Sequence, residues 1–140
     1  MPYNRFMQYI IMLIYMVSFV SEKSLHMEML LTEMSDRIAD AWNTVADGDA
    51  EAAIDFIADA DALFAQACAD MVDMRQCIGD AVLLFISKGD SMDDKGARAK
   101  ALLNAMSVCF EQSVQRVSSA EGLIAAARDL VRPVMGIGTN

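Results

Sequence analysis

Proline and glycine are scarce in this 140-residue chain, which has two prolines, Pro2 and Pro133, and seven glycines. Most of the glycines lie at Gly48, between residues 87 and 96, or after Pro133, so long stretches contain no helix-breaking residue. A fold built from short strands needs many more turn residues than this. The scarcity therefore favours long helices and argues against a β-sandwich.

A basic patch is also lacking. The chain has 20 acidic and 11 basic residues, which gives a net charge of −9 and an isoelectric point near 4.4. Lysine and arginine form no cluster along the sequence. Nucleic acids and anionic membrane surfaces are polyanions that attract basic patches. We therefore expect no nucleic-acid partner.

Patterns that carry catalysis or metal binding are missing as well. His26 is the single histidine, and no Glu-x-x-His pair, Gly-rich phosphate loop or G-x-S-x-G motif occurs. Cys68, Cys77 and Cys109 have no CxxC spacing, which indicates buried free thiols in a reducing compartment. We expect a protein that is not an enzyme and that binds no metal and no cofactor.

The acidic residues of the middle of the chain need a separate interpretation, because paired carboxylates can act in acid–base chemistry or bind cations. No histidine or calcium-loop glycine accompanies them, so we interpret them as a solvated helix face, and His26 as a partly exposed bystander. These acidic residues are Asp55, Asp59, Asp61, Asp70, Asp73 and Asp80.

Three heptad stripes of apolar residues run along most of the chain, and alternating steps of four and three residues connect their members. Such stripes are typical of long helices that pack along a continuous apolar seam. The first stripe is Phe6, Ile10, Leu13, Val17, Val20, Ser24, Met27, Leu31, Met34, Ile38, Ala41 and Val45. The second is Ala53, Ile57, Ala60, Phe64, Ala67, Met71, Met74, Ile78, Ala81 and Phe85. The third is Ala99, Leu103, Met106, Phe110, Ser113, Val117, Ala120, Ile124, Ala127, Val131 and Val134.

The breaks between the stripes predict the ends of the helices. Residues 47–49 supply a turn and an N-cap, Ser91 with Asp94 resembles a capping box, and Pro133 ends the last helix. We predict an all-α fold in a single domain, residues 1–140, with helices over about 5–46, 50–88 and 92–132. The short first connection makes helices one and two antiparallel, so the fold is a coiled-coil-like helical bundle. The polar loop at 87–96 leaves helix three free to pack in the same molecule or to pair elsewhere.

The N-terminal helix carries more apolar residues than one seam needs. The segment from Tyr9 to Val20 is apolar except for Ser18, whereas a bundle helix buries a single stripe. Burying one such side chain contributes roughly 1.5–3 kcal/mol, so several of them amount to a large unused free energy. We predict that the surplus side chains form an assembly interface, consisting of Ile11, Met12, Ile14, Tyr15, Met16 and Phe19.

Two other interpretations of this apolar segment stay open. A signal peptide would account for Arg5 and the apolar core, but no small-x-small cleavage site follows. A membrane anchor over residues 6–20 would cover roughly 22 Å of helix against a hydrocarbon core of about 30 Å. Arg5 and Lys23 could snorkel to extend this span. Burial against protein fits better, because the seam continues unbroken into Met27 and Leu31.

Heptad helices at both ends of the chain, with a strongly apolar one at the N-terminus, resemble the sheath-filament and translocator-tip proteins of type III secretion (EspA-like). Helix one, from Phe6 to Val45, and helix three, from Ala99 to Val134, would correspond to the terminal helices of that family. The resemblance implies that these helices form a coiled coil whose subunits polymerise into a hollow tube. It also implies a dedicated helical chaperone and a cytoplasmic stage before secretion to the cell surface.

The sequence thus predicts a structural or interaction protein that forms a homo-oligomer or filament through long helices. The alternatives are a small membrane-associated helical protein anchored by residues 6–20, and an acidic chaperone or adaptor that holds a partner's helix.

Overall fold

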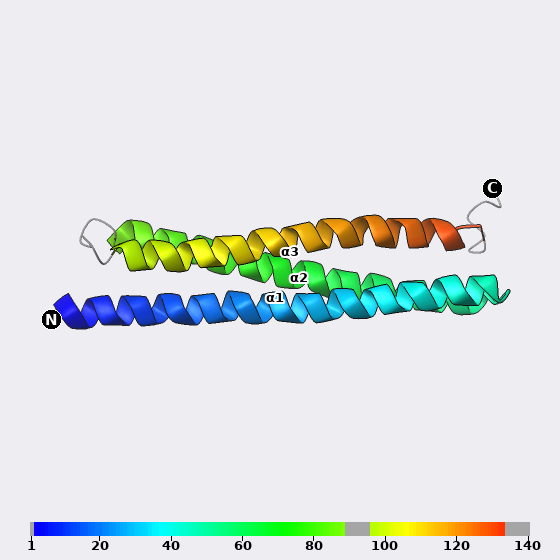
Figure 1. Cartoon of the computed structure of the whole chain (residues 1–140), viewed down its shortest axis with the longest axis horizontal. Helices are drawn as coiled ribbons and strands as arrows, with labels where there is room; N and C mark the ends of the chain where they lie inside the picture. The colour runs from blue at the N-terminus through cyan, green and yellow to red at the C-terminus, as the bar shows by residue number, and fades with distance from the viewer. Residues whose placement is uncertain (1, 89–95, 134–140) are drawn as a thin grey trace.

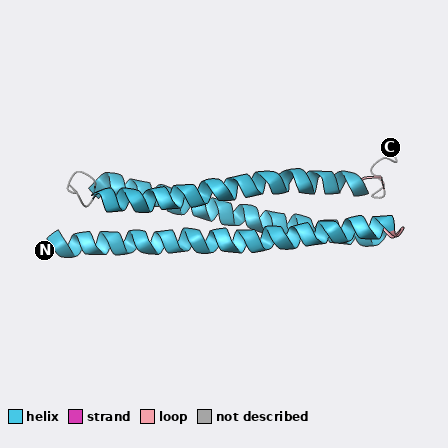
Figure 2. Cartoon of the chain, in the orientation of Figure 1, coloured by secondary structure: helices cyan, strands magenta, loops and turns pink. Residues whose placement is uncertain are grey.

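The protein is a bundle of three long helices. The computed structural model describes residues 2–88 and 96–133, and 96% of these residues are helical, with no strand among them (Figure 2). The helices are α1 (Pro2–Ala46), α2 (Ala50–Lys88) and α3 (Gly96–Val131). Figure 1 shows α1 and α3 running in the same direction, with α2 antiparallel to both, and each helix packs against the other two. The predicted all-α bundle is confirmed, and helix three packs within the same molecule.

The turn between α1 and α2 explains why the chain reverses at this point. Gly48 has a φ of 90°, a left-handed conformation that residues with a Cβ rarely adopt. The Gly48 amide donates to the Val45 carbonyl and the Asp49 amide to the Thr44 carbonyl, which together make a Schellman motif. Asp49 Oδ1 then accepts a hydrogen bond from the Ala52 amide at 3.1 Å, so Asp49 is the predicted N-cap of α2.

The other helix ends differ slightly from the predicted ones. α1 begins at Pro2 rather than residue 5, because proline is well tolerated in the first turn of a helix. α2 has the predicted bounds of 50–88, whereas α3 is described from Gly96 to Val131 against a predicted 92–132, and residues 89–95 lie outside the described residues. The capping box from Ser91 to Asp94 and the seam position Val134 lie outside the described residues.

The core follows the three predicted stripes. Every described seam position is buried or half-buried, in three clusters spaced along the bundle. Two polar seam residues face each other, since the hydroxyls of Ser24 and Ser113 form a buried hydrogen bond of 3.1 Å between α1 and α3. The pair satisfies both hydroxyls and fixes the register of the two helices.

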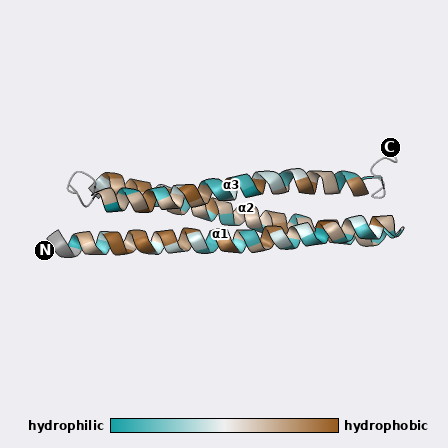
Figure 3. Cartoon of the chain, in the orientation of Figure 1, coloured by the Kyte–Doolittle hydropathy of each residue, from teal (hydrophilic) through white to brown (hydrophobic). Residues whose placement is uncertain are grey.

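Two buried residues lie off the predicted seam of α1, Tyr9 and Leu30. A helix that contacts two neighbours buries a wider stripe than one that contacts a single partner, and these residues extend the stripe toward its flanks. Figure 3 shows the strongest concentration of apolar residues over the N-terminal part of α1.

Candidate assembly interface

The predicted interface residues lie on the outside of α1, at its N-terminal end. Five of the six are exposed, and Tyr15 is the most exposed of them at 71%. Met16 differs from the others because it is half-buried and packs against the core cluster around Leu13. Met16 therefore belongs partly to the core of the monomer, while Ile11, Met12, Ile14, Tyr15 and Phe19 are available to a partner.

A shallow groove of about 440 Å³ runs between α1 and α2 beside these residues. Its α1 wall is apolar and its α2 wall is mainly polar, with two carboxylates. The lining residues are Met12, Tyr15, Met16 and Phe19 from α1, and Asp73, Gln76, Cys77 and Asp80 from α2. A helix that filled this groove would place apolar side chains against α1 and benefit from a basic residue near α2.

Other large apolar side chains are exposed outside the predicted interface surface. Leu25 and Met29 continue it along α1, and Met29 is 70% exposed. Leu83 and Ile86 are exposed on α2, as is Val108 on α3. These residues lie off the three seams, so their exposure follows from the heptad pattern once the number of helices is known.

The exposed apolar residues gather in one half of the bundle. We call residues 5–30, 66–88 and 96–119 the apolar half, and residues 31–65 and 120–133 the acidic half. Among the described residues, thirteen of the fifteen large exposed apolar side chains lie in the apolar half, whereas Trp42 and Leu123 lie in the acidic half. The apolar half has seven basic and six acidic residues, and the acidic half has three basic and eleven acidic residues. Formal net charges of +1 and −8 follow.

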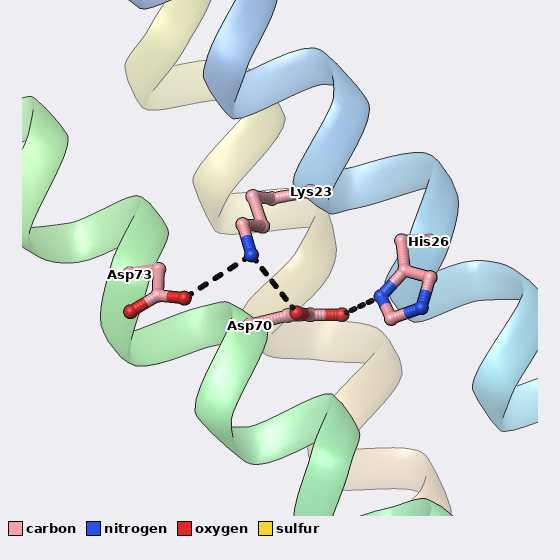
Figure 4. A network of polar contacts seen from close by, with 4 residues as sticks. All are labelled: Lys23, His26, Asp70 and Asp73. Atoms are coloured by element: carbon pink, nitrogen blue, oxygen red, sulfur yellow. Dashed lines mark hydrogen bonds and ion pairs between the residues drawn. The ribbon is translucent and has the colours of Figure 1, made fainter.

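A polar network joins α1 to α2 inside the apolar half (Figure 4). Asp70 is buried, and its Oδ2 lies 2.5 Å from Nδ1 of His26, while Lys23 Nζ lies 3.6 Å from Asp70 Oδ1 and 3.2 Å from Asp73 Oδ2. The interpretation of Asp70 as a solvated residue is therefore wrong, whereas His26 is partly exposed as expected and pairs with this buried carboxylate. Both helices face each other here, so the carboxylate is buried with partners that compensate its charge.

The network borders the candidate interface. Lys23 Nζ lies 5.6 Å from the ring centroid of Phe19, within the range of a cation–π contact. The hydrogen bond to Asp73, together with the nearby charge of Asp70, raises the pKa of Lys23 above its usual value of 10.5. Lys23 therefore stays charged at neutral pH, and its ammonium group contacts Phe19 at one edge of the candidate interface.

The remaining acidic residues of α2 divide into exposed and paired groups. Asp55, Asp59 and Asp80 are exposed, as predicted for a solvated face. Asp61 accepts hydrogen bonds from the Arg128 guanidinium of α3, and this pairing raises the pKa of Arg128. Asp61 thus helps to hold α3 against α2.

The three cysteines are free and half-buried. Burial is the main cause that raises the pKa of Cys68 and Cys77 above 9.0, so both thiols are protonated at neutral pH. Cys77 Sγ lies 3.8 Å from the Met16 carbonyl oxygen, a weak contact between α2 and α1. Protonated, partly buried thiols are poor nucleophiles.

A second open groove, of about 730 Å³, lies between α1 and α3. Its lining is polar, and Arg116 of α3 approaches Glu28 of α1 at 3.8 Å across it. In the described part of the chain, no group of three or more His, Cys, Asp or Glu side chains is placed to hold a metal ion.

Fold and surface together define an all-α, three-helix bundle with one apolar and one acidic half. Comparison with protein-family models, with curated proteins and with solved structures finds no match. Over Arg5–Ala46, α1 is the one helix among the described residues that is long and apolar enough to cross a membrane, and 28% of its apolar window is buried.

Proposed function

We propose that the protein is a structural subunit that assembles with copies of itself through the exposed apolar side chains of its apolar half. The observation that carries this proposal is the exposure of Ile11, Tyr15, Leu25 and Met29 on one helix whose opposite side is fully packed. Monomeric soluble proteins rarely expose large apolar patches, and such patches mark interaction sites.

Energetics indicate that the predicted six-residue interface is too small to act alone. Five of its side chains are about half exposed, so burying them contributes about 4–8 kcal/mol at roughly 1.5–3 kcal/mol for a fully transferred side chain. Association costs an estimated 4–15 kcal/mol in lost translational and rotational freedom. A stable assembly therefore needs additional contacts, which Leu25 and Met29 on α1 and Leu83 and Ile86 on α2 would provide.

The distribution of these residues favours an assembly with more than one contact per subunit. Exposed apolar residues occur on α1, α2 and α3 of the apolar half, so the subunit presents several faces to neighbours. Repeated contacts between different faces generate rings or filaments, whereas one self-complementary face generates a dimer. A secreted filament subunit of the type III secretion kind is the particular assembly that we propose, on the resemblance of the two terminal helices.

A helical chaperone is part of the same proposal. An apolar surface that is exposed before assembly promotes premature association, and a partner helix in the α1–α2 groove would cover it. The carboxylates of Asp73 and Asp80 favour a chaperone helix that carries lysine or arginine beside its apolar stripe.

Membrane association through residues 6–20 is the second candidate, and the apolar window of α1 favours it. The carboxylates of Asp73 and Asp80 border the same surface, and inserting them into a hydrocarbon layer would be costly. Assembly with protein avoids this cost, because a protein partner can supply compensating groups.

The test replaces two exposed side chains, Ile11→Asp and Tyr15→Asp, in one variant. Neither residue belongs to a core cluster, so the monomer should keep its helicity while two charges are placed in the contact. Light scattering should show that the assembly dissociates. The matched control is Ser35→Asp with Ala39→Asp, which has the same spacing on exposed positions of the acidic half and should leave the size unchanged.

A double variant at Ile11 and Tyr15 that kept the size of the wild-type assembly would contradict the proposal. Loss of helicity in this variant would show that the two side chains belong to the monomer core. If the wild type dissolves as a defined species in detergent alone, membrane association replaces self-assembly as the function.

A further inference from the structure

The exposed residues of α1 form a second stripe, opposite the buried seam. All seven of its members are exposed, and five of them are apolar. We call this set the outer stripe: Met7, Ile11, Ile14, Ser18, Glu22, Leu25 and Met29. At 100° per residue, these positions fall within about 40° of one line along the helix, so they form a single straight face.

The outer stripe has the same spacing in both directions from its centre. Starting at Ser18, steps of four, three and four residues lead to Ile14, Ile11 and Met7 on one side. The same steps lead to Glu22, Leu25 and Met29 on the other side. In a twofold contact between two antiparallel copies, each residue of one copy meets the residue equally far beyond the centre of the other, so the apolar residues seven and eleven positions from Ser18 would meet apolar residues.

We propose that two copies of this chain pair through their outer stripes in an antiparallel arrangement, with the twofold axis beside Ser18. The inference rests on the proposed function, since it specifies one of the contacts by which the subunits would assemble. Ile11 packs against Leu25 of the second copy, and Met7 packs against Met29. The small Ser18 side chains meet at the axis and allow the helices to approach closely.

Charge favours the antiparallel arrangement over the parallel one. A parallel pair would place the two acidic halves, each with a net charge of −8, side by side along the dimer. The antiparallel pair places them at opposite ends, beyond the paired stripes. Residues 7–29 overlap in this arrangement, and the acidic residues that α1 contributes to the acidic half begin at Glu33, beyond this overlap.

Glu22, a member of the outer stripe, also favours the antiparallel arrangement over the parallel one. In a parallel pair, the two Glu22 carboxylates would oppose each other inside the contact, which is destabilising. In the antiparallel pair, each Glu22 faces Ile14 of the second copy, and the two carboxylates lie about 12 Å apart along the helix axis at 1.5 Å per residue. Glu22 weakens the antiparallel contact but does not prevent it.

A cross-linking experiment distinguishes the two arrangements in the full-length protein. The variant Ile11→Cys with Leu25→Cys places two thiols about 21 Å apart on one helix, too far for a disulfide within the chain. After oxidation and trypsin digestion, residue 11 lies in peptide 6–23 and residue 25 in peptide 24–37, so mass spectrometry identifies the partners. Products of the three native thiols appear in other peptides.

The antiparallel pair predicts a disulfide between peptide 6–23 and peptide 24–37. Disulfides between two copies of the same peptide should be absent. Disulfides that join peptide 6–23 to a second peptide 6–23, and peptide 24–37 to a second peptide 24–37, would overturn the proposal in favour of a parallel contact. Two single variants control for chance collisions. Ser18→Cys should cross-link to itself at the axis, whereas Ala39→Cys, exposed on the acidic half of the same helix, should not.

Failure of this inference is distinct from failure of the proposed function. If light scattering shows an assembly but Ser18→Cys does not cross-link, the subunits associate through another face and the outer stripe is not an interface. If the wild type is a monomer without detergent, the self-assembly proposal itself fails. Small-angle scattering gives a further check, since the antiparallel dimer would be about 84 Å long and a parallel one about 67 Å at 1.5 Å per residue.

Discussion

The apolar half and the acidic half of the bundle are built alike inside and differently outside. Both bury heptad seams of the same kind, with Leu13 fully buried in one half and Ile124 fully buried in the other. On the surface, the apolar half exposes thirteen large apolar side chains, whereas the acidic half exposes two and carries a net charge of −8. The three-helix fold therefore does not require the exposed apolar residues, because the acidic half has the same helices and nearly none of these residues.

The largest expected effect concerns the interior, where the halves should behave alike. Leu13→Ala and Ile124→Ala each remove a fully buried side chain, so each should lower the free energy of unfolding by about 2–5 kcal/mol. Denaturant titration of dissociated protein measures both. A much smaller effect of Leu13→Ala would mean that the core of the apolar half is incomplete without a partner.

The next effect concerns the buried carboxylate of the apolar half. His26→Ala removes the partner of Asp70 Oδ2, and a hydrogen bond to a charged group contributes about 1.5–3 kcal/mol to the free energy of unfolding. In an Asp70→Leu background, the same substitution should have almost no effect, because no buried charge is left. Equal losses in the two backgrounds would show that the pair is not coupled.

A smaller effect is expected from the serine pair between α1 and α3. Ser24→Ala or Ser113→Ala leaves one buried hydroxyl without its partner and should cost about 1 kcal/mol in the free energy of unfolding. The double substitution should restore most of the loss, since both polar groups are then absent. If the double variant loses the sum of the two single effects, each hydroxyl has another role.

The smallest expected effect is a loss of stability at alkaline pH, and it should come mostly from groups in the apolar half. Burial raises the pKa of Tyr9 and Cys77 above 10.0 and 9.0, and the hydrogen bond to Asp73 raises the pKa of Lys23 above 10.5. The folded state therefore holds these protons more tightly than the unfolded state does. The stability that these three groups contribute should be fully present at pH 7 and fall as the pH rises through their folded-state pKa values. Thermal unfolding between pH 7 and 11 tests the sign, and a rise in stability above pH 9 would contradict it.

Most of the fold could be predicted because heptad stripes specify both the helices and their buried faces. The turn at Gly48 and the N-cap at Asp49 could also be predicted, because both depend only on the residue types at these positions. Tyr9 and Leu30 were missed because their burial depends on how many helices surround α1, which a single stripe does not encode.

The pairing of His26 with Asp70 depends on the register of α1 against α2, which the turn sets. Gly48 lies 22 residues from His26 and 22 residues from Asp70, so two antiparallel helices that leave this turn bring the residues together. Lys23 and Asp73 are likewise each 25 residues from Gly48. Counting outward from the turn would have found the network, whereas composition and motif searches could not.

The contrast in charge between the halves was also present in the sequence, but it is visible only after the three helices are aligned. Acidic residues of α1 and α2 on both sides of Gly48 come together at the turn end of the bundle, and residues 120–133 add no net charge there. The exposed interface residues were predicted because the N-terminal segment has more apolar side chains than one buried seam can accommodate. Met16 was the exception, because the neighbouring helix α2 covers part of it.

In the proposed assembly, other copies of the chain cover the apolar half. The most direct measurement is the molar mass of the wild-type protein by light scattering at neutral pH, first without detergent and then with a mild detergent. If the chain assembles with copies of itself, discrete oligomers or fibres of the 15.3 kDa chain should form without detergent. A monodisperse 15.3 kDa species without detergent, or a protein that is soluble in detergent alone, would contradict it.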